Sequence, residues 1–228
     1  MTSATVPSNR SGMIHQEYHN LGTNRAADRA APLATINDDG GMVELVTPRL
    51  LLRRWRDDDV AAMAMINADR EVMRWIGDGS VVDYAQTAAE IAAFEQVWQM
   101  RGFGRFAVEI RGTGVLAGFT GMAIPADIPE IMPCVEIGWR LGREHWGRGL
   151  ATEAAKAALG FAFADCRLDR ILGIHVVGND ASARVMVKLG MRFDRETTEL
   201  GYGRPVHVYV IDRYEIQPSR PACRRRPD

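Results

Sequence analysis

Two glycines separated by a single residue, Gly147 and Gly149, stand where a predicted strand gives way to a predicted helix. Glycine adopts backbone angles that turn successive N–H groups to one side, and the first helical turn adds about half a positive charge. Together these features favour an anion site that could hold a diphosphate without a lysine. The alternative is an ordinary tight turn, because glycine pairs end strands in many proteins.

Two common nucleotide motifs do not fit this turn. A phosphate loop of the Walker type ends in Gly-Lys-Ser/Thr, whereas Leu150 and Ala151 follow Gly149 here. A dinucleotide fingerprint needs a third glycine three positions further on, where Thr152 stands. The turn therefore indicates a different kind of diphosphate site.

One carboxylate, Glu136, lies in an otherwise apolar predicted strand just before this turn. Such a group must face a wet cleft or be paired, so Glu136 is a candidate general base, acting directly or through one water. The alternative is a structural ion pair with Arg105 or Arg140. Strict alternation puts Glu136, Gly138 and Arg140 on one face, unless a bulge near Gly138 shifts the later residues.

Other reactive side chains carry weaker signals. His175 lies in an apolar predicted strand, where a histidine in the core is more common than a base. Tyr202 and Tyr209 either line an acceptor pocket or pack. Four aromatic residues are more often core than pocket and are assigned no site: Trp55, Trp75, Phe94 and Trp98.

Strands and helices alternate along the chain and must position these residues. Expected strands cover 50–55, 106–110, 115–122, 134–141, 170–177, 191–198 and 206–211. One helix is expected after the aspartates at 57–59, which form its acidic cap. Further helices are expected at 84–100, 151–162 and 179–189, and a left-handed Gly190 closes the last of them. Residues 106–122 read as an antiparallel hairpin, and 125–133 as a loop. The order predicts a mixed α/β or α+β domain.

Composition narrows the class of protein. The 228 residues are 46% hydrophobic and 25% charged, which suits one domain with a sizeable core. A net charge of −1 gives no electrostatic case for nucleic acid or an anionic membrane as partner. The three cysteines are far apart, so neither a disulfide framework nor a zinc site is expected, and a reducing cytoplasm is the default. Neither a membrane span nor a signal-peptide pattern is present in the sequence.

The two ends lack the apolar periodicity of a core. Residues 1–42 are rich in small and polar types, and 218–228 carry three prolines and the cluster Arg224-Arg225-Arg226. Both are expected to be flexible tails around a domain at 43–217. The basic cluster is interpreted as a solvated tail rather than a nucleic-acid contact.

Several short motifs occur in a fixed order within residues 43–216. They are Thr47-Pro48-Arg49-Leu50-Leu51-Leu52-Arg53, Glu136-Ile137-Gly138-Trp139, Trp146-Gly147-Arg148-Gly149-Leu150-Ala151-Thr152-Glu153-Ala154, Asn179-x-x-Ser182 and Lys188-Leu189-Gly190-Met191. This combination resembles the GNAT superfamily of acyl-coenzyme A-dependent N-acetyltransferases, and within it the RimJ/RimL-like branch. The resemblance implies a mixed, mostly antiparallel central sheet of about six to seven strands flanked by helices, acetyl-CoA as cosubstrate, and no metal.

The resemblance also implies where acetyl-CoA (acetyl-coenzyme A) binds. Backbone N–H groups from Gly147 to Ala151 and the hydroxyl of Thr152 would hold the diphosphate, and the pantetheine arm would add along the strand edge at 139–141. Asn179 would bond a pantetheine amide or cap its helix. The implied cofactor-binding set is Trp139, Leu141, Trp146, Gly147, Arg148, Gly149, Leu150, Ala151, Thr152 and Asn179.

Catalytic roles follow from the same resemblance. Glu136 would serve as base or substrate positioner, and Ser182 would protonate the leaving thiolate or be a plain first-turn residue. A main-chain N–H near Gly138 and Trp139 would stabilise the developing oxyanion. The chain departs from the superfamily pattern twice. Glu144 replaces a Gln or Arg, so it should point to solvent, and Met186 replaces the tyrosine that often acts as general acid.

The acceptor amine stays open at this point. A protein N-terminus, as the RimJ/RimL-like pattern implies, and a small molecule such as an aminoglycoside or polyamine are both admissible, in a monomer or a homodimer. An alternative of another class is a non-catalytic acyl-CoA-binding regulatory module, which the changes at Glu144 and Met186 permit. A protein that binds ATP or NAD is a third hypothesis.

Overall fold

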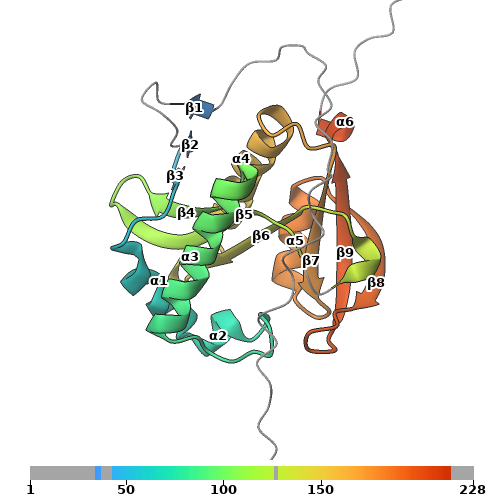
Figure 1. Cartoon of the computed structure of the whole chain (residues 1–228), viewed down its shortest axis with the longest axis horizontal. Coiled ribbons are helices and arrows are strands. Elements are labelled where there is room, and N and C mark those ends of the chain that lie inside the picture. The colour runs from blue at the N-terminus through green and yellow to red at the C-terminus, as the bar shows by residue number, and fades with distance from the viewer. Residues whose placement is uncertain (1–33, 37–42, 126–127, 217–228) are drawn as a thin grey trace, which may run out of the picture. The chain divides into compact units, whose positions relative to one another are not determined.

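A computed structural model describes residues 34–36, 43–125 and 128–216, all in the compact unit that begins at Pro32. Within them nine strands form one sheet in the order β1-β2-β3-β4-β5-β6-β7-β9-β8 (Figure 1). The strands are β1 (Ala34–Ile36), β2 (Val43–Val46), β3 (Leu50–Arg53), β4 (Arg105–Ile110), β5 (Val115–Ala123), β6 (Glu136–Leu141), β7 (Arg170–Val176), β8 (Arg192–Thr198) and β9 (Pro205–Asp212). Only β6 and β7 pair in parallel. The predicted mixed, mostly antiparallel sheet is confirmed, with more strands than expected.

Helices connect and cover these strands. They are α1 (Asp59–Asn67), α2 (Arg70–Met73), α3 (Tyr84–Arg101), α4 (Leu150–Ala164), α5 (Asp180–Lys188) and α6 (Arg213–Ile216), with 3-10 turns η1 (Pro129–Ile131) and η2 (Arg143–His145). The longer elements agree with the sequence expectations to within a few residues, and Gly190 has the expected left-handed backbone. The short β1, β2, α2 and α6 were not expected, because too few residues set their period. None of the described helices combines the length and the apolarity that crossing a bilayer requires.

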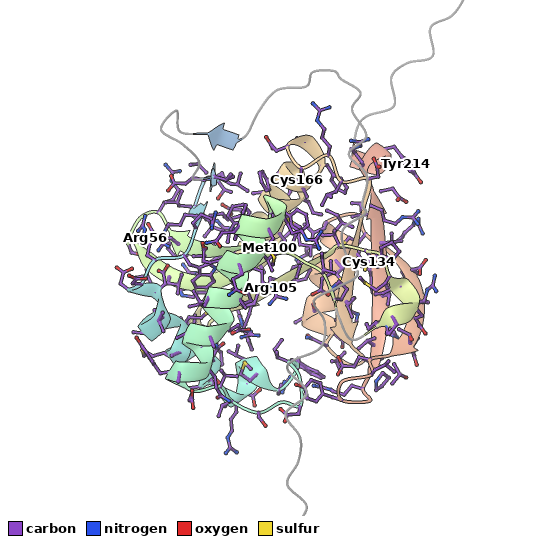
Figure 2. All side chains as sticks on the ribbon, in the orientation of Figure 1. Arg56, Met100, Arg105, Cys134, Cys166 and Tyr214 are labelled. Atoms are coloured by element: carbon purple, nitrogen blue, oxygen red, sulfur yellow. The ribbon has the colours of Figure 1, made fainter. Side chains whose placement is uncertain are left out.

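The predicted tails fall almost wholly outside the described residues. Within the stretch 1–42 the structure places β1, which pairs antiparallel with β2. The flexibility of the remaining residues and of 218–228 stays a prediction. Two of the three cysteines are described, Cys134 and Cys166, and they are free thiols that lie well apart (Figure 2).

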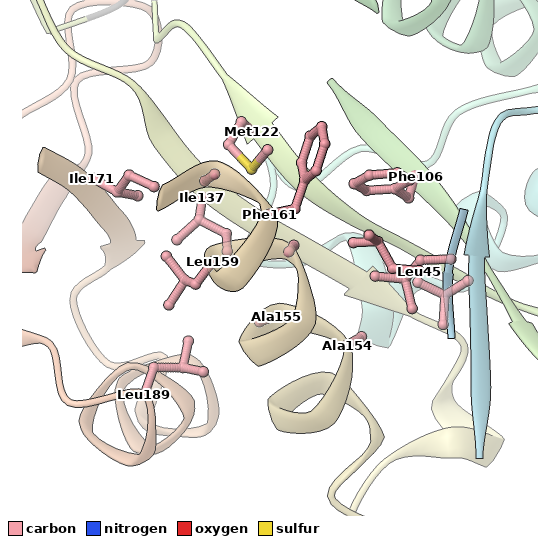
Figure 3. Close-up of a cluster of buried hydrophobic side chains, with 14 of the residues drawn as sticks. Leu45, Phe106, Met122, Ile137, Ala154, Ala155, Leu159, Phe161, Ile171 and Leu189 are labelled. Carbon is pink, nitrogen blue, oxygen red and sulfur yellow. The ribbon is translucent and has the colours of Figure 1, made fainter. Parts of the chain in front are cut away.

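Two hydrophobic cores lie on opposite faces of the sheet. Ala107 and Phe119 pack with α1 and α3, whereas Phe106 and Val108, their alternates on β4, belong to the core under α4. Small residues on α4 bring this helix close to the strands (Figure 3), and four of them are fully buried: Ala154, Ala155, Ala158 and Ala162. The close contact holds α4 against β6, which it follows after η2 and the glycine turn.

The acidic cap expected at 57–59 is wrong in its details. Asp58 occupies the cap position of α1 but makes no side-chain cap, and Asp59 turns inward instead. Its carboxylate binds the Arg53 guanidinium through two hydrogen bonds of 2.7 and 2.8 Å and accepts the Arg56 N–H at 2.8 Å. Glu109 contacts Arg53 as well, at 2.8 Å, and both Arg53 and Asp59 are 4% exposed. A buried ion pair therefore ties α1 to β3 and β4.

Asp59→Ala should lower the free energy of unfolding by about 3–5 kcal/mol, because it leaves the Arg53 cation buried without its main partner. Asp58→Ala, at the exposed neighbouring position, should change it by less than about 0.5 kcal/mol. Urea unfolding of both variants measures the difference. Equal losses would show that the ion pair does not hold α1.

Candidate functional site

The central feature of the site is the separation of β6 and β7. β6 pairs with β5 along its whole length, but with β7 only at Glu136 and Leu172, where the Leu172 N–H donates to the Val135 carbonyl at 2.9 Å. Main-chain groups of a strand alternate in direction with a period of two. The Ile137 N–H is taken up by the bridge at Leu172. The Ile137 carbonyl and the main-chain groups of Trp139 point the same way as the Val135 carbonyl, into a gap where the described part of β7 supplies no partner.

This gap opens into a cleft of about 620 Å³. Its walls come from β6, the turn before α4, the end of β7 and the start of α5, and its far end is closed by residues 72–76 and by α3. All of the predicted site residues line this cleft except Arg148. The structure thus brings together Glu136 and Ser182, which lie 46 positions apart in the sequence.

The glycine turn has the geometry that an anion site needs. Gly147 and Gly149 have φ of +70° and +77°, in the left-handed region that favours glycine. Gly149 is the N-terminal cap residue of α4, and no side chain caps the helix there. A Cβ on Gly147 would meet nothing within 4 Å, so the turn faces open space. The first N–H groups of α4 are therefore available to a ligand.

An arginine from the β2–β3 turn braces the glycine turn. The Arg49 guanidinium donates to the Arg148 carbonyl at 2.8 Å and to the Glu153 carboxylate at 2.6 Å. Glu153 also accepts hydrogen bonds from the Thr47 hydroxyl and the Arg49 N–H. Burial alone would raise the pKa of Glu153, but these hydrogen bonds hold that pKa below its ordinary value. The brace explains why Arg148 does not line the cleft: its carbonyl is held against Arg49.

Glu136 lies beside Arg105, the partner that the sequence offered as one structural alternative. Nη2 of Arg105 is 3.5 Å from Oε1 of Glu136, and the two side chains are 21% and 18% exposed. Arg140, the other alternative, binds the Asn67 amide oxygen at 2.7 Å and the Glu90 carboxylate at 3.0 Å. The pairing of β6 with β5 is unbroken past Gly138, so this part of β6 has no bulge. Glu136, Gly138 and Arg140 therefore lie on one face of the strand, as strict alternation predicts.

Asn179 and Ser182 meet at the start of α5. The Asn179 side chain accepts the Ser182 N–H at 3.2 Å and caps the helix, as the structural alternative held. Ser182 lines the cleft, and its hydroxyl has no hydrogen-bond partner among the described residues. Met186, in place of the usual tyrosine, is 1% exposed and packs against β7 at Gly173.

The remaining predicted residues divide between core and surface. His175 is buried, with Nδ1 2.9 Å from the Val176 carbonyl, and burial lowers its pKa. Its ring packs edge-on against His207 and beside Tyr209, which suits the core interpretation, although it also borders the cleft. Tyr202 is 56% exposed and lies outside the cleft. Trp55, Phe94 and Trp98 are core residues, whereas Trp75 lines the cleft.

Two exposed residues flank the glycine turn. The Glu144 side chain is 67% exposed, which confirms that it points to solvent. Trp146 is 45% exposed and is not a core residue, and its indole N–H binds the Leu141 carbonyl at 2.8 Å. The main-chain carbonyl at the end of β6 is therefore already occupied by the protein.

Three charged residues line the cleft beside Phe119 and are called its floor: Glu90, Arg105 and Arg140. Of these, Glu90 was not identified from the sequence. Glu90 lies on the buried face of α3, between Thr87 and Ile91, and this spacing was a signal that could have marked it. Asn67 bonds Thr87 and Glu90, and it is fully buried. Among the described residues, no group of three His, Cys, Asp or Glu side chains could hold a metal ion.

Comparison with known proteins bears on this geometry. Residues 49–192 match a family model described as an acetyltransferase (GNAT) domain. The chain is 30% identical over 171 residues to the N-acetyltransferase YoaA of Bacillus subtilis, covering 73% of this chain and 95% of that protein.

Solved structures share the fold at lower identity. A ribosomal-protein-S5-alanine acetyltransferase from Vibrio fischeri matches with a TM-score of 0.63 and 16% identity, covering 77% of this chain and all of that one. Mycobacterium smegmatis RimJ, in complex with CoA-disulfide, matches with a TM-score of 0.63 and 19% identity, covering 74% and 84%. With a family model that spans most of the chain, the protein belongs to the GNAT family of acetyltransferases.

Proposed function

We propose that this chain transfers an acetyl group from acetyl-CoA directly to a primary amine, as a member of the RimJ/RimL-like branch. The observation that carries the proposal is the gap between β6 and β7, which runs into the uncapped glycine turn. The fold shared with a RimJ protein bound to CoA-disulfide supports it. The proposed site lies in one domain at 43–217, and the two free thiols suit the reducing cytoplasm proposed from the cysteine spacing.

The residues present fit coenzyme A along this path. The N–H groups from Gly147 to Ala151 and the Thr152 hydroxyl would hold the diphosphate, where no side chain caps α4. The carbonyls of Ile137 and Trp139 would accept hydrogen bonds from the amides of the pantetheine arm, as in an added strand, while the Ile137 N–H stays in the bridge to β7. Asn179 would contact that arm from the opposite wall, with the amide group that its cap leaves unused.

The chemical step needs a proton acceptor, a donor to the developing negative charge, and a proton donor. Glu136 would accept the proton of the acceptor ammonium, directly or through one water, so that the neutral nitrogen can attack the thioester carbon. The Trp139 N–H would donate to the carbonyl oxygen as its charge develops. The C–N bond forms, the nitrogen loses its second proton to water, and the C–S bond breaks. The Ser182 hydroxyl would protonate the departing thiolate, with its own proton replaced from water.

Acceptors of two kinds remain admissible within this function. The name of the Vibrio neighbour, a ribosomal-protein-S5-alanine acetyltransferase, supports the amino group of a protein. A small-molecule amine is the other candidate. Neither requires a metal.

Gly149→Trp should weaken acetyl-CoA binding by about tenfold or more, because a bulky side chain at φ +77° strains the turn and covers its amides. Gly114→Trp is the matched control, since Gly114 has φ +72° and open space around it in the distant β4–β5 turn. Calorimetric titration measures both affinities. If Gly149→Trp binds as tightly as Gly114→Trp, the turn does not hold the diphosphate.

Arg49→Met should weaken acetyl-CoA binding by about fivefold, because the Arg148 carbonyl loses a charged hydrogen bond that holds the turn in shape. Arg56→Met removes an arginine of similar exposure on the α1 side of the sheet and should leave the affinity unchanged. The same titration reports both. Identical affinities in the two variants would contradict a role for the brace.

Glu136→Gln should lower kcat/KM by about a hundredfold at pH values where the acceptor amine is protonated. The loss should shrink as the pH rises through the pKa of the amine, since a neutral amine needs no base. Glu196→Gln, an exposed strand carboxylate outside the cleft, is the control. If Glu136→Gln lowered kcat/KM by the same factor at every pH, Glu136 would have a structural role. If the protein bound acetyl-CoA but released no thiol with any amine, the regulatory module would be favoured.

A further inference from the structure

The floor of the cleft holds two arginines whose hydrogen-bonding capacity is largely unused. The guanidinium carbons of Arg105 and Arg140 each lie 5.0 Å from the centre of the Phe119 ring. The Nε atoms of both are buried and have no hydrogen-bond partner in the part of the chain that the structure describes. Arg140 bonds Asn67 and Glu90 through one terminal nitrogen. Within the described ranges, the one polar contact of the Arg105 side chain is the long one of 3.5 Å to Glu136. Figure 2 shows Arg105 next to α3.

Each of these two cations faces one carboxylate, Arg105 that of Glu136 at 3.5 Å and Arg140 that of Glu90 at 3.0 Å. The Arg140 side chain is 5% exposed. Burial lowers its pKa, Glu90 opposes this effect, and the nearby charge of Arg105 lowers the pKa further. Buried like charges are stabilised when an anion lies between them, and charge-assisted bonds to a carboxylate are shorter than 3.5 Å. The floor therefore has an excess of donors over acceptors.

We propose that Arg105 and Arg140 form a subsite for a carboxylate of the acceptor, so that the acceptor is a free amino acid or a similar small amino carboxylate. This inference rests on the proposed function, in which Glu136 receives the acceptor ammonium. A zwitterion matches the Glu136–Arg105 pair, with its ammonium on Glu136 and its carboxylate on the guanidiniums. Arginine suits this task, because its planar group binds carboxylates through parallel hydrogen bonds.

The other acceptor classes fit the floor less well. A polyamine or an aminoglycoside would bring further positive charge beside the buried Arg140 and the half-buried Arg105. A peptide N-terminus offers a neutral carbonyl oxygen at the corresponding position, and hydrogen bonds to neutral acceptors are weaker than those to carboxylates. The subsite thus favours the free acid over its amide and over the amine that lacks the group.

The test compares matched acceptors: L-amino acids, their carboxamides and their decarboxylated amines, each with acetyl-CoA and detection of the released thiol. We expect kcat/KM to be about tenfold or more higher for the free acid than for its two partners. Arg105→Gln should abolish this preference while leaving the KM for acetyl-CoA unchanged, and Arg105→Lys should restore part of it. Arg195→Gln, on an exposed arginine of β8, should leave the preference intact.

Equal efficiency within the matched sets, or a preference for the amide or for a polyamine, would overturn the subsite. If no acceptor is turned over, thermal unfolding with coenzyme A and the N-acetyl amino acids decides instead. The free acids should then raise the Tm more than their carboxamides, and Arg105→Gln should remove the difference. If the parent protein shows no such difference in Tm, the proposal is overturned. Failure to bind acetyl-CoA in calorimetry would show that the proposed function itself is wrong, whereas binding without carboxylate preference contradicts this inference alone.

Discussion

The incomplete pairing of β6 with β7 is the constraint on which the site depends. A strand in the middle of a sheet normally has both edges satisfied, yet β6 keeps a partner along its length on the β5 side alone. The main-chain groups on its other edge can be satisfied by water or by a ligand with amides of its own. The parallel contact at Glu136 and Leu172 holds the closed end of the gap, and the glycine turn stands at its open end.

The loops around the cleft are held mainly by arginines that bind main-chain carbonyls or carboxylates. Arg49 holds the glycine turn, and Arg204 of the β8–β9 loop donates to the Gly77 carbonyl at 2.7 Å. Arg143, from η2, forms an ion pair of 3.0 Å with Asp69 at the start of α2. These contacts connect segments more than fifty residues apart in the sequence.

Much of the fold could be predicted because its signals are local. The apolar periods of α3 and α4, the hairpin of β4 and β5, and the left-handed Gly190 each depend on neighbouring residues. The proposed cofactor turn was also visible, since strand, glycine pair and helix follow one another directly. The separation of β6 and β7 has no signal in either strand alone, because each resembles any buried strand and the pairing is a tertiary choice. For the same reason Asp59 was taken for a helix cap, and the partners of Arg105 and Arg140 could be named only as alternatives.

The central claim is that the gap beside β6 and the turn that follows it are the seat of acetyl-CoA. A crystal structure of the protein with acetyl-CoA tests it most directly. The account predicts the diphosphate on the N–H groups of residues 147–151 and the pantetheine arm paired with Ile137 and Trp139, its thioester near Glu136. A coenzyme bound elsewhere, or a turn whose amides are closed by the protein's own carbonyls, would contradict it.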